Sequence, residues 1–226
     1  MRNETLNTKA SRRLAGTTRK SDADAVARGE CGEAARREME SLLRQALAEH
    51  GEAALRSTRR DSAVHEAGHC AVYHAEGEKL RSAAIWPVDG TGWSGITHAG
   101  GRWQVNPYTA PQDDLSRARI TIAGWAAEVL EQGDDVAAAS SLDEIVLFQQ
   151  IVGAAAHKLG DDPSRLCAEQ MGLVAATLAE NWTAVQNIAN ALERRKRLNG
   201  AQLKAMLKAR GGKDTRAAPA HYRLTP

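Results

Sequence analysis

The chain has 226 residues, of which 42% are hydrophobic and 4% aromatic, and its 30 basic residues nearly balance its 28 acidic ones. This length suits one catalytic-sized domain with tails, and the balanced charge gives no reason to expect a nucleic-acid partner. Abundant alanine with few aromatic residues favours close-packed helices over a β-sandwich. We therefore expect a mainly α protein of the α+β kind.

Cysteine usage and hydropathy bear on the cellular compartment. Cys31, Cys70 and Cys167 are odd in number and form no Cys-x-x-Cys pair, which favours neither a disulfide framework nor a thiolate zinc site. The sequence has no run of about 18 apolar residues and no apolar N-terminal signal. We expect a cytoplasmic protein without a membrane span.

The chain divides into four predicted segments. Residues 1–30 are polar and basic without apolar periodicity, which predicts a flexible tail. Residues 31–58 form a lead-in with a predicted helix from Glu33 to Leu55. The main domain is expected over 59–210, and 211–226 are a second predicted flexible tail.

Within the domain, the first predicted helix has Asp61 or Ser62 in its first turn and ends near Gly77. Turn residues from Pro87 to Gly92 then predict a β-hairpin or small sheet. Ser141 and Glu144 are spaced as a capping box, in which both side chains satisfy the first free amides of a helix. The later helices are predicted from Asp113 or Asp114, from the Ser141 box to about Leu159, over 163–180, over 182–197, and from Ala201 to Ala209.

The first helix of the domain carries His65-Glu66-Ala67-Gly68-His69. Four residues advance a helix by about 400°, so the two imidazoles are stacked about 6 Å apart and can reach one ion. Glu66 lies about 100° from His65, where its carboxylate can touch water on that ion without becoming a ligand. The motif predicts a zinc hydrolase with Glu66 as its catalytic acid-base group.

A catalytic zinc needs a third protein ligand, and this helix does not supply it. His74 lies about 140° round the helix from His69, and the residues at positions 72 and 75 break the metzincin spacing His-x-x-Gly-x-x-His. Spacing alone leaves several candidates open. They are His98, Glu128, Asp134, Asp135, Asp143 and His157.

Several motifs together resemble the peptidase domain of the FtsH family of ATP-dependent zinc proteases. They are HEAGH, AAIWPVDGTGWSGITHAGG, AGWAAEVL and AASSLDEIVLFQQIV, and the resemblance covers about residues 60–210. It implies Asp143 as the third zinc ligand, because residues 139–143 match the family's Gly-Ala-x-x-Asp segment. It also implies that Glu128 orients a ligand histidine from outside the coordination shell.

The resemblance implies a zinc metalloendopeptidase that cuts unfolded or flexible polypeptide segments, with Glu66 activating a zinc-bound water. The hairpin from Ala83 to Thr97 would align an extended peptide as an added strand. The sequence lacks a G-x-x-x-x-G-K-[ST] phosphate loop, so the protease is expected either to cut flexible segments unaided or to receive unfolded substrate from a separate ATPase. The family's six-fold ring implies a homo-hexamer. The alternative is a non-catalytic, metal-stabilised module that binds proteins.

Overall fold

The computed structural model describes residues 44, 48, 57–88, 92–100, 109–132 and 141–209. Its helices and strands are α4 (Arg59–Ala75), β1 (Leu80–Val88), β2 (Gly92–Ala99), α5 (Pro111–Gln132), α6 (Leu142–Leu159), α7 (Pro163–Glu180), α8 (Trp182–Arg195), β3 (Arg197–Asn199) and α9 (Gly200–Lys208). The predicted mainly α fold of the α+β kind is confirmed. Apart from residues 44 and 48, the predicted helix from Glu33 to Leu55 lies outside the described residues, as do both predicted tails.

Helix α4 begins with a capping box. The Asp61 N–H donates to Thr58 Oγ1 at 3.1 Å, and the Thr58 N–H donates to the Asp61 carboxylate at 2.7 Å. The prediction that Asp61 lies in the first turn is therefore confirmed. The helix ends at Ala75, and the predicted stop, Gly77, has a φ of 80° in the turn that follows.

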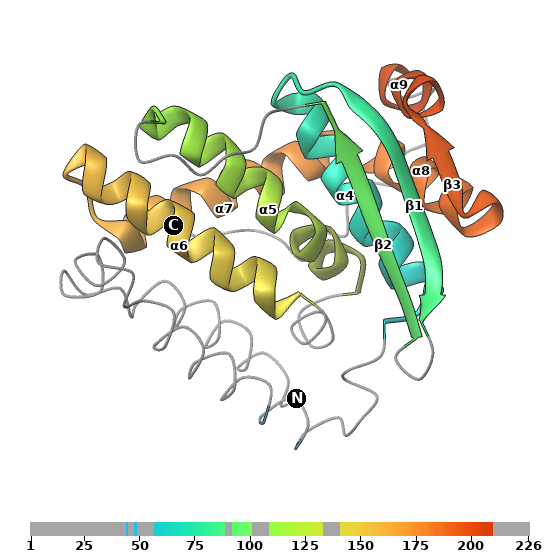
Figure 1. The fold of residues 1–226 in the computed structure, drawn as a ribbon, viewed down its shortest axis with the longest axis horizontal. Coiled ribbons are helices and arrows are strands. Elements are labelled where there is room, and N and C mark those ends of the chain that lie inside the picture. The colour runs from blue at the N-terminus through green and yellow to red at the C-terminus, as the bar shows by residue number, and fades with distance from the viewer. Residues whose placement is uncertain are drawn as a thin grey trace.

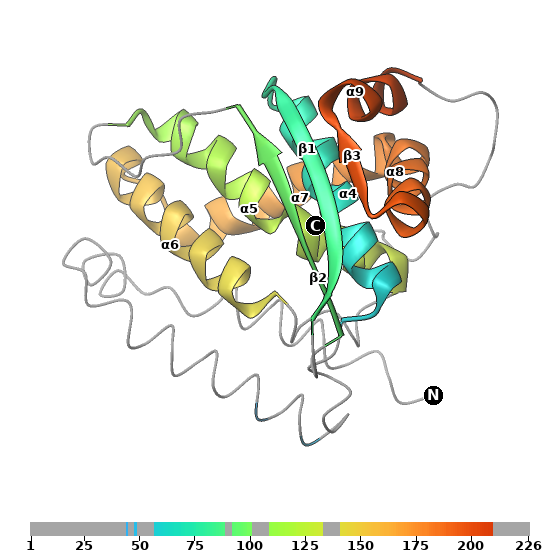
Figure 2. The same cartoon turned by 45° about the vertical axis from the view of Figure 1, so that its right-hand side comes forward.

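The predicted hairpin is confirmed, and it belongs to a three-stranded antiparallel sheet in the order β2-β1-β3. In its register Ile85 pairs with Gly95, and Ala83 pairs with Thr97. Ala83 and Ile85 are buried, whereas Trp86 points to the exposed face. The sheet lies across α4, with α5 and α6 on one side and α8 and α9 on the other (Figures 1 and 2).

Strand β3 was not predicted, and it begins at Arg197, the last residue of a predicted helix. The helix expected over 182–197 stops at Arg195, because Lys196 takes a left-handed backbone with a φ of 60°. Leu198 is then fully buried and pairs with Ala83 of β1. The predicted helix extended two residues too far, to Lys196 and Arg197, and β3 was missed because a three-residue strand depends on a partner strand far away in the sequence.

Helices α4 and α5 approach each other closely at Gly68. A Cβ built there would lie 2.5 Å from the Cβ of Ala127 and 2.6 Å from the carbonyl oxygen of Ala123, so a larger residue would force the helices apart. This close contact places the histidines of α4 against α5.

The core lies among these helices and the sheet. Its largest fully buried apolar side chains are Ile122, Leu178, Ile188, Leu192, Leu198 and Leu203. Within the part of the chain that the structure describes, no helix is both long and apolar enough to cross a membrane.

Candidate metal centre

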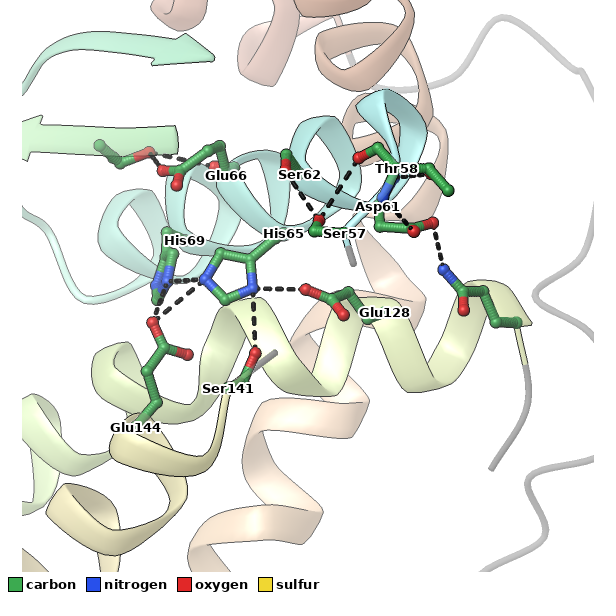
Figure 3. Close-up of polar contacts among 12 residues, drawn as sticks. Ser57, Thr58, Asp61, Ser62, His65, Glu66, His69, Glu128, Ser141 and Glu144 are labelled. Carbon is green, nitrogen blue, oxygen red and sulfur yellow. Dashed lines mark hydrogen bonds and ion pairs between the residues drawn. The ribbon is translucent and has the colours of Figure 1, made fainter. Parts of the chain in front are cut away.

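Three ligand atoms from two helices converge at one point. The Nε2 atoms of His65 and His69 lie 3.1 Å apart, and Glu144 Oε1, from the first turn of α6, lies 3.1 Å from the former and 3.0 Å from the latter (Figure 3). The histidines meet because they are one helical turn apart. Among the described residues, these three form the group that could hold a metal ion.

The other ring nitrogens are fixed by acceptors. His65 Nδ1 lies 2.6 Å from Glu128 Oε1, and His69 Nδ1 lies 2.9 Å from the carbonyl oxygen of Ile120. A carboxylate and a carbonyl only accept hydrogen bonds, so both Nδ1 atoms carry a proton and donate it. In neutral rings, the Nε2 lone pairs therefore face one another and Glu144.

The cluster attracts positive charge. Burial lowers the pKa of His65, but Glu144 and Glu128 outweigh it and the pKa is raised well above its ordinary value. The pKa of His69 is also raised, since Glu144 outweighs burial there too. Burial alone would raise the pKa of Glu144, but the two histidines hold it well below its ordinary range.

The donor set fits zinc. Ligands about 2.0–2.1 Å from a tetrahedral zinc stand roughly 3.3 Å apart, close to the separations of 3.0–3.1 Å found between these atoms. Two imidazoles and one carboxylate are typical ligands of catalytic zinc. Glu144 Oε2 is also buried without a hydrogen-bond partner, an arrangement that a cation beside the carboxylate would compensate.

Gly124 of α5 makes room for the first histidine. A Cβ built on Gly124 would lie 2.5 Å from Cδ2 of His65 and closer still to its Nε2. Glycine inside a helix costs about 1 kcal/mol relative to alanine, and the close approach of His65 gives a packing reason for it at this position. This glycine was visible in the sequence, but Gly172 of α7, where a Cβ would meet nothing within 4 Å, shows that a helical glycine alone does not identify such a contact.

Glu66 lies on the side of α4 that faces β2, whereas His65 and His69 face α5 and α6 (Figure 3). Glu66 is only 4% exposed, and its carboxylate accepts a hydrogen bond from Thr97 Oγ1 at 2.6 Å. Glu66 is also among the charges that raise the pKa of His69, so its carboxylate acts on the cluster electrostatically. Glu66 is thus a buried carboxylate on the helix that carries both histidines.

The residues expected at the site are not all brought together. His65, Glu66, His69 and Glu128 lie at it, but Asp143 is exposed and does not join the ligand group. Adjacent residues of a helix point about 100° apart, and the orientation of α6 directs Glu144 to the histidines instead. The group of side chains that could hold an ion thus contains Glu144, the residue that follows Asp143.

The predicted capping box at the start of α6 was wrong. Ser141 makes no side-chain cap hydrogen bond, and its Oγ lies 3.4 Å from His65 Nδ1. Glu144 is engaged with the histidines. Both side chains thus contact the histidines and do not cap the helix. The local Ser-x-x-Glu pattern could not distinguish these uses.

Of the other third-ligand candidates, Asp134 and Asp135 lie outside the described residues. His98 and His157 are described and do not belong to the ligand group. No family model and no curated protein matches the chain.

Proposed function

We propose that this protein is a zinc-dependent metalloendopeptidase that hydrolyses unfolded or flexible polypeptide segments. The observation that carries the proposal is the convergence of three atoms: His65 Nε2 and His69 Nε2, from the helix that also bears Glu66, and Glu144 Oε1, from α6. These three side chains would hold the ion and leave a coordination position open, as catalytic rather than structural zinc requires.

When bound, zinc supplies Lewis-acid chemistry that acidifies water and polarises a carbonyl. Glu66 takes a proton from the attacking water and passes it to the leaving amine. Glu128 and the carbonyl of Ile120 keep the two imidazoles in the tautomer that presents Nε2. Glu66 and the two imidazoles are thus each restricted in orientation by their hydrogen bonds.

The edge of β2 supports a place for the substrate. The Trp93 N–H donates to Ser57 O at 2.9 Å on the side away from β1, and the Ile85 N–H donates to Lys196 O at 2.9 Å, away from β2. Because backbone groups alternate along a strand, those of Gly95 and Thr97 also face the outer edge. Among the described strands, β2 has only β1 as a neighbour, so an extended peptide could add there.

Two glutamate-to-glutamine variants test the proposed peptidase function. Wild type, Glu66→Gln and Glu180→Gln, an exposed control at the end of α7, are compared for zinc content and for cleavage of unfolded casein. Glu66→Gln should keep zinc and lose nearly all cleavage, while Glu180→Gln should match wild type. A zinc-loaded wild type that cleaves no unfolded substrate would favour the non-catalytic binding module. Cleavage by Glu66→Gln at the wild-type rate would refute the role of Glu66.

The FtsH-like resemblance extends the proposal to assembly. We propose a cytoplasmic homo-hexamer that receives unfolded polypeptide from a separate ATPase. Light scattering of the full chain measures the assembly, and a monomer at all concentrations tested would contradict it.

A further inference from the structure

Strand β2 contacts the Glu66 carboxylate at two points. Thr97 Oγ1–H donates to Glu66 Oε2 at 2.6 Å. A Cβ built on Gly95 would lie 2.5 Å from both Cγ and Oε1 of Glu66, so the carboxylate lies directly against the Gly95 backbone. Gly95 and Thr97 are two residues apart and therefore face the same side of the strand.

Both contacts restrict the carboxylate. An O–H···O⁻ bond of this length is in the range of charge-assisted hydrogen bonds, which are about twice as strong as neutral ones. The Thr97 hydroxyl is itself confined, because it also lies 3.2 Å from the Glu66 carbonyl oxygen and 3.7 Å from Cys70 Sγ. A β-branched side chain has few χ1 rotamers to exchange between. The donor is therefore fixed before the base is used.

We propose that Gly95 and Thr97 are the positioning residues of the catalytic glutamate, an inference that rests on the proposed peptidase function. Thr97 binds Oε2 and leaves Oε1 to accept the proton of the attacking water. Gly95 provides the space in which Oε1 lies. Neither residue touches the reacting atoms through its side chain, so both act through Glu66.

The same two residues connect this role to substrate binding. Their side-chain positions face Glu66, while their backbone N–H and C=O groups face the outer edge of β2, where the proposed substrate strand adds. The short stretch of β2 that contains Gly95 and Thr97 therefore positions the proposed base, Glu66, and also binds the proposed substrate peptide. A change confined to the Thr97 side chain should disturb the base and leave peptide binding intact.

Kinetics of the zinc-loaded protein give the first test. Thr97→Val keeps the shape of the side chain but has no donor, and it should lower kcat roughly 10–100-fold with KM and zinc content unchanged. Thr97→Ser restores the hydroxyl and should recover most of kcat. Thr177→Val is the matched control, because Thr177 lies on α7 and donates only to Leu173 O. Gly95→Ala should also lower kcat with zinc retained.

Two results would overturn the positioning role. One is a Thr97→Val protein with wild-type kcat. The other is a Thr97→Ser protein as impaired as Thr97→Val, since the hydroxyl would then not be the active feature.

A double-mutant cycle on folding tests the contact without any activity measurement. Thr97→Val should lower the equilibrium constant for folding about 10-fold or more, because it leaves a buried carboxylate without its donor. In a Glu66→Met background the same change should have little effect. Equal effects in both backgrounds would overturn the contact. A wild type without hydrolysis would instead overturn the proposed function, even if the coupling were present.

Discussion

Replacing Gly124 with alanine should disable the proposed zinc centre through one methyl group. The added Cβ would lie 2.5 Å from Cδ2 of His65, whereas ordinary contact begins at 3.4 Å. The ring must therefore move by about 1 Å, or α5 must withdraw. Withdrawal of α5 would cost the close packing of Ala123 and Ala127 against Gly68 of α4. Zinc ligands tolerate displacements of only about 0.2 Å, so His65 Nε2 should cease to be an effective ligand.

The expected loss of zinc affinity is at least about 100-fold, the upper range for losing an outer partner of a ligand. Competition with a chromophoric chelator measures this affinity. Urea unfolding of the metal-free protein measures stability separately, and overpacking should cost about 1–3 kcal/mol.

Gly172→Ala is the matched control. Gly172 lies within α7, and a Cβ there would meet nothing within 4 Å. This change should stabilise the fold by about 0.5–1 kcal/mol and leave zinc affinity unchanged. If Gly124→Ala bound zinc within about threefold of wild type, the inferred dependence of the ligand geometry on the missing side chain would be refuted.

Two further predictions concern charged groups. Glu144→Gln should reduce zinc affinity at least as much as loss of an outer partner does, about 10–100-fold, whereas Asp143→Asn should leave zinc affinity nearly unchanged. If a chelator competition gave the reverse order, Asp143 and not Glu144 would be the third ligand. Burial raises the pKa of Glu76, but hydrogen bonds from Arg119 and Ser116 outweigh burial and lower that pKa below 4.5. The ionised Glu76 side chain therefore stabilises the fold above this pH, and the stabilisation is lost as the pH falls. Glu76→Gln should therefore cost about 1 kcal/mol at pH 7 in urea unfolding, with a gap to wild type that closes in acid; a gap independent of pH would contradict this.

Local sequence patterns predicted the elements that depend on local chemistry. Helix α7 runs over the expected 163–180, because Asp162 caps its first amides and Pro163 occupies its first turn. The histidine pair of α4 follows from helical periodicity alone. These features require no knowledge of neighbouring elements.

Other features depend on how distant elements meet. Asp143 and Glu144 are both carboxylates in the first turn of α6, and only the rotation of α6 against α4 decides which reaches the histidines. The contact of Thr97 with Glu66 likewise depends on β2 packing over α4. Tertiary packing decides between these alternatives, and a single sequence contains no local signal that distinguishes them.

The missing cap at Ser141 has a consequence for folding. The first turn of α6 is anchored by Glu144, whose partner His65 is 79 residues away in the sequence, and not by the side chain of its own N-cap. An ion shared by these residues would act as a cross-link that closes this long loop. The amino end of α6 would then be the place where fraying begins once the ion is removed, and amide hydrogen exchange should be fastest there within that helix.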